Sequence, residues 1–248
     1  MPGCMKRKSS RRSRRFKSRP MNKKLNKVNK KEMITVICIL VIMVCIAAFF
    51  AISSEALRNN QFHYEQSLEE TAVTVGDQKI SLKEASYYIM VMESNYNEAA
   101  NIYNADNLDS FWNVNINHKY IKTMAKEAII DACIRDNVYY QQARKEGYEL
   151  NEDSIKLVEE QALDEMGKLT ADQMEITDYT KEDMIKVLTK IQYAKEYVSD
   201  LMDEGYTEEE LDTGGSKYEE IEKNYHPKSN DNVWDNITIG KVTINYER

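Results

Sequence analysis

The sequence contains few of the residues that end or bend regular structure. It has eight glycines and three prolines in 248 residues, and Pro227 is the only proline beyond residue 20. β-Sandwiches and β-barrels need many tight turns that are rich in these two residues, so the composition argues against both classes. It favours a mainly α-helical fold with a small β element.

Cysteine is also scarce. Of the four cysteines, only Cys133 lies beyond residue 52, so no disulfide can form within the larger part of the chain. Cys133 lies on an apolar helical stripe, and no histidine is near it in sequence. We therefore predict that it is a buried, small apolar side chain and not a nucleophile. Without a disulfide scaffold, the fold must be stabilised by packing.

Motifs that carry chemistry are missing as well. The sequence has no glycine-rich phosphate loop, no paired His and Cys at metal-ligand spacing and no Gly-x-Ser-x-Gly motif. Its acidic pairs lack the ligand spacing of a calcium-binding loop. We predict no catalytic, cofactor-binding or metal-binding residue, and therefore a protein that binds a partner and is not an enzyme.

Charge divides the chain into two parts with an apolar run between them. Residues 1–32 carry 14 Lys and Arg against Glu32 alone, whereas residues 53–248 carry 20 Lys and Arg against 40 Asp and Glu, a net charge of −20. The 20 residues 33–52 contain no charge, and a helix of that length spans about 30 Å, the thickness of a bilayer core. We predict a transmembrane helix. The alternative is a cleaved signal peptide, whose apolar region usually has about 7–15 residues.

The charges on the two sides of residues 33–52 predict the orientation of the span. Seven Lys and Arg precede it within about 20 residues, and Arg58 alone follows closely. The N-terminus is then cytoplasmic, and a single-pass protein of the cell membrane exposes residues 53–248 on the outer side. The basic tail, residues 1–32, is predicted to be disordered and to contact anionic lipid headgroups. It lacks interleaved aromatic residues, so no nucleic acid partner is expected.

Beyond a polar stalk at residues 53–71, residues 72–248 are predicted to form one helical domain. Residues 72–80 alternate like a β-hairpin, and Ser81 and Glu84 form a capping box that starts a helix. That helix has an inward stripe of Leu82, Ala85, Ile89, Met92, Tyr96, Ala99 and Tyr103. Further helices are predicted over residues 118–146, 151–167 and 180–205, with Gly147 as a left-handed cap after the first and Asn151 and Thr180 as N-caps of the second and third. The second has an inward stripe of Ile155, Val158, Ala162, Leu163 and Met166, and the third one of Val187, Leu188, Ile191, Ala194, Val198 and Leu201. Thr207 and Glu210 form a capping box that predicts a further short helix. Residues 237–239 and 241–245 have strand character, and we expect them to pair with residues 72–80.

Two segments of this domain resemble the N-terminal domains of the SurA/PrsA family of extracytoplasmic foldases. The first is Val75-Gly-Asp-Gln-Lys-Ile-Ser81 followed by Glu84, and the second is the helix junction over residues 141–152. The resemblance implies a helical cradle, similar to the trigger factor chaperone module, that shields unfolded polypeptide. It also implies structural roles for Val75, Gly76, Ile80, Glu84, Ala143, Gly147 and Tyr148.

The chain departs from this family in one respect. Many members insert a parvulin prolyl-isomerase domain, which needs roughly 100 residues, but only 28 residues separate Gly205 from Trp234. The histidines at positions 63, 118 and 226 do not match the paired active-site histidines of parvulins. The resemblance therefore implies a foldase-like module that lacks isomerase activity.

The predicted function is that of a membrane-anchored chaperone-like protein that binds unfolded or partly folded segments of exported proteins. Amphipathic rings adapt to many partners, so the candidate contacts with such clients are Tyr87, Tyr88, Met92, Tyr139 and Tyr140. Core packing is the alternative role for these side chains. Two other functions are open: a scaffold that binds one specific envelope partner, and a degenerate prolyl isomerase.

Overall fold

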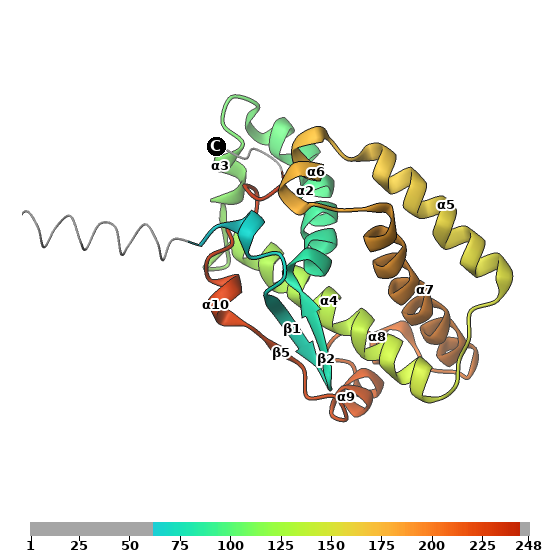
Figure 1. Cartoon of the computed structure of the whole chain (residues 1–248). Helices are drawn as coiled ribbons and strands as arrows, with labels where there is room; N and C mark the ends of the chain where they lie inside the picture. Colours follow the sequence, from blue (N-terminus) through green and yellow to red (C-terminus); the bar gives the residue numbers. More distant parts are fainter. Residues whose placement is uncertain (1–61, 244–248) are drawn as a thin grey trace, which may run out of the picture. The chain divides into compact units, whose positions relative to one another are not determined.

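The computed structural model describes residues 62–243 (Figure 1). The predicted basic tail, the predicted span at residues 33–52 and the first part of the predicted stalk lie outside the described residues. Among residues 62–243, no helix combines the length and the hydropathy of a membrane span. A mainly helical fold with a small sheet, as the composition predicted, is confirmed for this part of the chain.

A three-stranded sheet lies at one side of the helices. The predicted hairpin is present as β1 (Thr71–Val75) and β2 (Gln78–Ser81), which pair antiparallel. Gly76 in the turn has φ +57°, and its amide donates to the carbonyl of Tyr225. The third strand, β5 (Lys228–Ser229), pairs with the other edge of β1, which gives the order β2-β1-β5.

Residues that we assigned to the end of the stalk contact this module. The single-turn helix η1 (Tyr64–Gln66) places the Tyr64 hydroxyl 2.6 Å from the hydroxyl of Ser86. The carbonyls of Leu68 and Glu70 accept hydrogen bonds from the amides of Lys83 and Leu82. The packed part of the chain therefore includes residues that precede β1.

Four long helices form the body of the module: α2 (Leu82–Asn104), α4 (Ile121–Lys145), α5 (Glu152–Lys168) and α7 (Lys181–Asp203). Helix α7 packs between α4 and α5, and α2 packs on α4 (Figure 1). The predicted N-caps are confirmed, since the side chains of Ser81, Asn151 and Thr180 each accept a backbone hydrogen bond from the first turn of a helix. The second half of the predicted Ser81 capping box is wrong, because Glu84 points into the core.

Several short elements lie where the sequence predicted loops. The Asn-rich stretch contains α3 (Asp109–Trp112) and the two-stranded hairpin β3 (Asn115–Ile116) and β4 (Lys119–Tyr120). The segment between α5 and α7 contains α6 (Ala171–Thr177). The remaining short helices are α8 (Glu208–Leu211), α9 (Ser216–Glu222) and α10 (Asp231–Trp234). The short helix predicted from the Thr207 and Glu210 capping box is confirmed as α8. Elements such as α3 and α10 are too short to be stable alone, so their form depends on packing that no local pattern reveals.

The predicted C-terminal strands are wrong within the described residues. Residues 237–243, here called the strap, form turns and bends, and bury the side chains of Ile237, Ile239 and Val242. The place beside β1 is taken by β5, and the indole of Trp234 donates to the carbonyl of Ala72 at 2.9 Å. The end of the module therefore does return to its beginning, but through residues 228–234. The apolar spacing of the strap reflected burial and not strand pairing.

Two predicted inward stripes are correct only in part. In α2, Leu82, Ala85 and Ile89 are buried, but Tyr96, Ala99 and Tyr103 are exposed. In α5, Val158 and Ala162 are buried against α7, whereas Ile155 and Leu163 are exposed. In both helices, part of the predicted stripe therefore lies outside the packed core.

Candidate functional site

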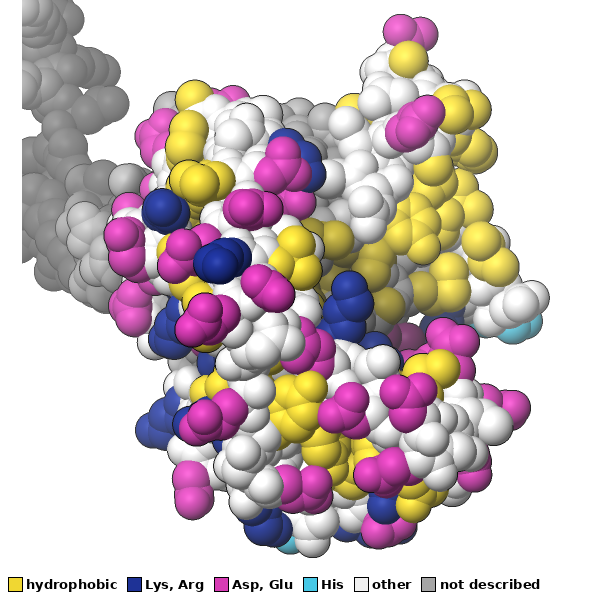
Figure 2. Space-filling view, turned by 90° about the vertical axis from the view of Figure 1, so that its right-hand side faces the viewer, with side chains coloured by type: hydrophobic (Ala, Val, Ile, Leu, Met, Phe, Trp, Pro, Cys, Tyr) yellow, Lys and Arg dark blue, Asp and Glu magenta, His cyan; other side chains and the backbone are white. Residues whose placement is uncertain are grey.

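Figure 2 shows a hollow on one face of the module. A lobe that holds α3 and the β3–β4 hairpin lies on one side of the hollow, and the other helices lie on the opposite side. Hydrophobic side chains gather on the wall that this lobe provides. Two open cavities are defined by their lining residues, and together they are here called the cleft. One lies between α4 and α7 and has about 400 Å³; the other lies between α2, α5 and α7 and has about 450 Å³.

The α4–α7 cavity is lined mainly by apolar side chains of α7. Ile191, Ala194, Val198 and Met202 follow the helical spacing of three and four residues, so they form one stripe. Helix α4 provides Tyr139, and the polar lining consists of Arg135, Asp136, Lys195 and Ser199. Met202 is exposed in this cavity, and a flexible thioether of this kind adapts to differently shaped partners.

The α2–α5 cavity combines aromatic, aliphatic and polar groups. Its lining includes Tyr87, Val91 and Met184, with Glu165 and Lys168 at the α5 side. Burial raises the pKa of Tyr87 to about 12, with a further contribution from the nearby carboxylates of Glu165 and Asp136. The hydroxyl of Tyr87 is therefore protonated at neutral pH and can donate a hydrogen bond.

Asp136 is the titratable group that links the two cavities electrostatically. It lines the α4–α7 cavity and accepts a hydrogen bond of 3.1 Å from the hydroxyl of Tyr88. Burial raises the pKa of Asp136 to about 6, although the charge of Arg135 and the hydrogen bond from Tyr88 act in the opposite direction. Its charge therefore changes between mildly acidic and neutral pH.

A buried ion pair fixes the helices beneath the cleft. The ammonium group of Lys190 on α7 lies 2.6 Å from the carboxylate of Glu84 on α2 and donates to the side-chain oxygen of Asn137 on α4 at 3.2 Å. All three side chains are buried. Removal of one partner of such a pair leaves an uncompensated buried charge, which typically costs about 3–5 kcal/mol. The contact therefore holds α2, α4 and α7 in one arrangement.

The strap is fastened to α2 by a second buried carboxylate. Glu93 accepts hydrogen bonds from the amides of Gly240, Val242 and Thr243 and from the Thr243 hydroxyl, at 2.5, 3.2, 2.7 and 2.6 Å. Burial raises the pKa of Glu93, and these hydrogen bonds oppose the shift. The strap thereby fixes the second half of α2, which forms one wall of the cleft.

The structure places the five predicted client-contact residues in different surroundings. Tyr87 lines the α2–α5 cavity, and Tyr139 borders the α4–α7 cavity although it is buried and its hydroxyl donates to the carbonyl of Leu211. Tyr88 is buried, and Met92 packs half-buried against the core. Tyr140 packs against Tyr193 and lines a separate shallow cavity beside β2. The structure therefore brings only Tyr87 and Tyr139 to the cleft.

The residues of the two family-like motifs mostly have structural surroundings. Val75, Ile80 and Ala143 are fully buried, and Gly76 and Gly147 have φ +57° and +79°. The left-handed cap that the sequence predicted after α4 is therefore confirmed at Gly147. Glu84 forms the ion pair described above, and the half-buried Tyr148 donates from its hydroxyl to Glu196 at 3.2 Å.

Some lining residues were missed by the sequence analysis. Ile191 and Val198 were assigned to the core because a helical stripe does not distinguish a packed face from the floor of an open cavity. Val91 and Asp136 lie outside the predicted stripes and gave no signal in the sequence. Met202 follows Leu201 near the end of α7. A single apolar residue at the end of a helix does not by itself predict a binding surface.

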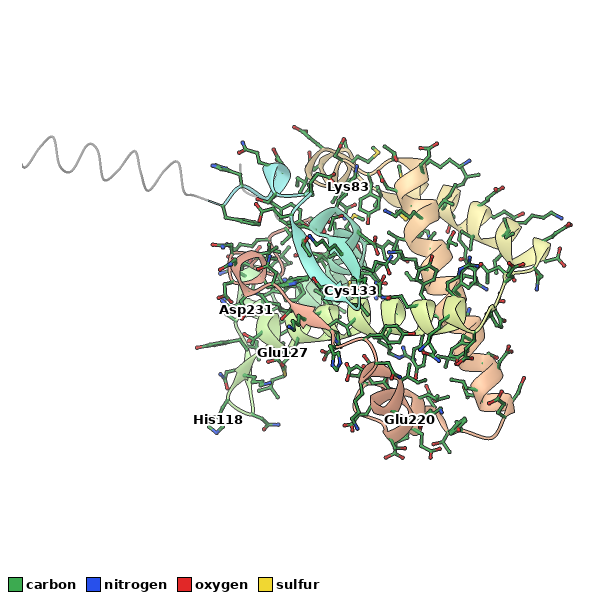
Figure 3. All side chains as sticks on the ribbon, turned by 60° about the horizontal axis from the view of Figure 1, so that its bottom comes forward. Lys83, His118, Glu127, Cys133, Glu220 and Asp231 are labelled. Atoms are coloured by element: carbon green, nitrogen blue, oxygen red, sulfur yellow. The ribbon has the colours of Figure 1, made fainter. Side chains whose placement is uncertain are left out.

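No arrangement for covalent chemistry was found around the cleft. His63 precedes η1, His226 follows α9, and His118 points outward at the tip of the β3–β4 hairpin, while Cys133 lies inside the module (Figure 3). Burial raises the pKa of the Cys133 thiol, which keeps it protonated. Within residues 62–243, no group of three or more His, Cys, Asp and Glu could hold a metal ion. The cleft is suited to noncovalent binding of apolar groups.

The chain matches no protein-family model, no curated protein and no solved structure. The resemblance to SurA/PrsA domains therefore rests on the residues quoted for it. Function is inferred from the geometry and chemistry of the cleft.

Proposed function

We propose that this protein is a chaperone-like module that holds unfolded or partly folded segments of exported proteins in its cleft, without ATP and without isomerase chemistry. The observation that carries the proposal is the pair of open cavities lined by Tyr, Met, Val and Ile side chains. Val91 and Met202 are exposed there, and Tyr87, Ile191 and Val198 are half-buried, although the adjoining core is closely packed. Such a surface favours weak contact with many apolar segments over tight contact with one ligand.

The size and chemistry of the cavities agree with reversible binding. Each cavity has room for a few side chains, and burial of apolar surface contributes about 25 cal/mol per Å². Ordering an unfolded segment has an entropic cost that offsets much of this gain, which keeps the complex weak. The acidic surface, with a net charge of −20 over residues 53–248, disfavours aggregation of the module.

The location is part of the same proposal. Residues 33–52 would anchor the protein in the cell membrane, with the N-terminus in the cytoplasm and the cleft on the outer side. Protease added to intact cells tests this orientation, because an external module is digested. A module that is protected until the cells are lysed would contradict it.

The proposed binding is tested by suppression of the aggregation of a reduced, unfolded secreted protein. The full-length chain in lipid nanodiscs is expected to suppress aggregation, and the double variant Val91→Glu and Met202→Glu to lose this effect. Both positions are exposed and line the cleft, so the fold should tolerate the change. The matched control is Ile155→Glu with Leu163→Glu on α5, outside both cavities.

Other outcomes would point to other functions. No suppression by the wild-type chain at several-fold excess would contradict the proposal. Crosslinking in cells that yields a single stoichiometric partner, instead of many exported proteins, would support the scaffold. Catalysis of proline isomerisation in a test peptide would support an isomerase, and we expect none.

A further inference from the structure

The lobe beside the cleft carries a set of exposed apolar side chains. Residues 91–120, here called the arm, comprise the second half of α2, α3 and the β3–β4 hairpin. Ile102 is 80% exposed and Tyr103 is 59% exposed, and exposed positions are also held by Tyr96, Ile116 and Tyr120. Soluble surfaces seldom expose so many large apolar groups in one segment unless the segment makes a contact.

These side chains stand on a rigid base. The ring of Phe111 contacts those of Tyr96 and Tyr103 at centroid distances of 6.1 and 6.2 Å, and Trp112 is buried beneath. The strap adds an ion pair of 2.7 Å between Lys241 and Asp109 of α3. Exposed rings that are already ordered lose little entropy when they bind, so the arm is suited to contact a partner.

The arm continues the lining of the cleft. Val91 and Asn95 line the α2–α5 cavity, and Ile102 lies eleven residues after Val91, which is close to three helical turns. Ile102 therefore lies on the same side of α2, beyond the end of the cavity. In Figure 2 hydrophobic side chains cover the lobe next to the hollow. A chain held in the cleft can reach the arm without a change of direction.

The charges of the arm favour a partner of one kind. Residues 91–120 contain four carboxylates, eight asparagines and a single cation, Lys119, which is paired with Glu127 of α4. One of the four carboxylates, Glu93, is buried beneath the strap. Asp109 is paired with Lys241, whereas Glu98 and Asp106 form no ion pair within residues 62–243. On a module with a net charge of −20, these carboxylates repel acidic segments and attract basic ones.

We propose that the arm is a second contact for the client in the cleft, and that the preferred client segment is apolar, flanked by Lys or Arg and free of Asp and Glu. This inference rests on the proposed function and specifies its substrate class. The apolar centre of the segment contacts the cleft and the exposed Ile102 and Tyr103, and its basic flanks lie near Glu98 and Asp106.

Labelled peptides with one apolar centre and Lys, Ser or Glu flanks test the proposal by fluorescence anisotropy with the full-length chain in nanodiscs. We expect the Lys-flanked peptide to bind at least about tenfold more tightly than the Glu-flanked one, a difference of about 1.4 kcal/mol. The difference should shrink in high salt, because screening weakens charge attraction. Glu98→Gln with Asp106→Asn should reduce the preference without loss of binding by the Ser-flanked peptide.

The arm itself is tested with Ile102→Ser and Tyr103→Ser, which should weaken binding of the Ser-flanked peptide at least fivefold. Ile155→Ser and Leu163→Ser, at 49% and 56% exposure on α5, form the matched control and should leave binding unchanged. All four positions are exposed, so loss of the fold is not the expected cause of any effect.

The possible failures are distinguishable. If the wild-type chain binds none of the peptides, the proposed function fails. If the wild-type chain binds the peptides but the arm variant binds them equally well, the cleft remains the proposed binding site and the arm is not a client contact. Equal affinity for Lys-flanked and Glu-flanked peptides overturns the charge preference. An arm variant that changes only the sedimentation of the protein shows that the arm contacts a second copy, which overturns the proposal.

Discussion

Asp136 combines partial burial with a place on the wall of an open cavity. A carboxylate in such a position costs free energy because water is partly excluded, and Tyr88 offers a single hydrogen bond in return. Between about pH 4 and pH 6 the folded protein holds the Asp136 proton more tightly than the unfolded chain does. The contribution of this residue to stability therefore decreases as the pH rises through that interval.

The variant Asp136→Asn should be more stable than the wild type at pH 7.5, by up to about 3 kcal/mol if the whole shift in pKa is removed. An amide has nearly the same shape, still accepts from Tyr88 and carries no charge. Near pH 4 the wild-type carboxyl is protonated, so the difference should be small. Urea unfolding in detergent micelles, followed by the fluorescence of the buried Trp112 and Trp234, measures both values.

A difference in stability that is the same at both pH values would contradict this account, because it would reflect packing and not charge. Glu127→Gln on the exposed face of α4 serves as the control. Loss of the Glu127 charge breaks only a surface ion pair with Lys119, and such a pair contributes less than about 1 kcal/mol to stability.

Single residues also show which features the sequence encodes directly. The prediction that Cys133 is a buried apolar side chain is confirmed, as are the N-caps Ser81, Asn151 and Thr180. A cap depends on a hydroxyl or amide side chain within a few residues of the amide it serves. The ion pair between Glu84 and Lys190 joins residues 106 positions apart, and no local pattern predicts such a partner.

Among the elements, the strap shows how a short segment can fix a larger one. Gly240 has φ +92°, and a Cβ atom at this position would lie 2.5 Å from the ring of Trp112. Two requirements therefore favour glycine: the left-handed backbone and the close approach to the indole. Together with the hydrogen bonds to Glu93, this contact attaches the strap to α2 and α3.

The variant Gly240→Ala should loosen the strap, because alanine adds both backbone strain and a clash with Trp112. Gly214→Ala is the matched control, since Gly214 has φ +84° but no atom within 4 Å of the added Cβ. We expect the control to cost about 1–2 kcal/mol, and Gly240→Ala to cost at least about 2 kcal/mol more. Urea unfolding measures the totals.

Hydrogen exchange then locates the effect. In Gly240→Ala, the amides of α3 and of the second half of α2 should exchange faster, while those of α7 remain protected. Equal unfolding free energies for the two variants would show that the Trp112 contact does not hold the strap.

The helices themselves show the limits of periodicity. The stripe of α2 continues to Tyr103, but in the second half of the helix α3 covers only part of it, so Tyr96 and Tyr103 stay exposed. In α5, the neighbour α7 covers Val158 and Ala162 and leaves Ile155 and Leu163 in solvent. An apolar stripe predicts which face of a helix favours burial. It does not predict whether another element covers that face, because the covering element lies elsewhere in the chain.

The module as a whole carries a large excess of negative charge. Ion pairs on its surface are mostly solvent-exposed, and such pairs contribute little. Repulsion among the carboxylates should therefore be the larger electrostatic effect on the stability of the folded module at neutral pH.

Added salt should stabilise this module. An increase in NaCl from about 20 mM to about 300 mM shortens the screening length from about 20 Å to about 6 Å, which weakens repulsion over the surface. The urea midpoint at pH 7.5 should rise, as measured by tryptophan fluorescence of the full-length chain in micelles. The control is the same series near pH 4, where protonated carboxyl groups reduce the effect. A midpoint that falls with salt would show that the ion pairs dominate.

The sequence by itself determined the helical class, the four long helices, their caps and the first hairpin. Each of these depends on residues within one or two turns of one another, such as Thr180 and Asp183 at the start of α7. It also determined the acidic charge of residues 53–248, since net charge is a sum that needs no fold.

Only the tertiary structure decided where the apolar stripes are covered and where they remain open. The pairing of β5 with β1, the closure of the strap on Glu93 and the two cavities each join segments that lie tens of residues or more apart. Contacts of this kind depend on how the helices pack together, and amphipathic spacing describes each helix alone. The cleft therefore lies where the apolar faces of helices are not covered by another element, and only the packed fold determines where that is.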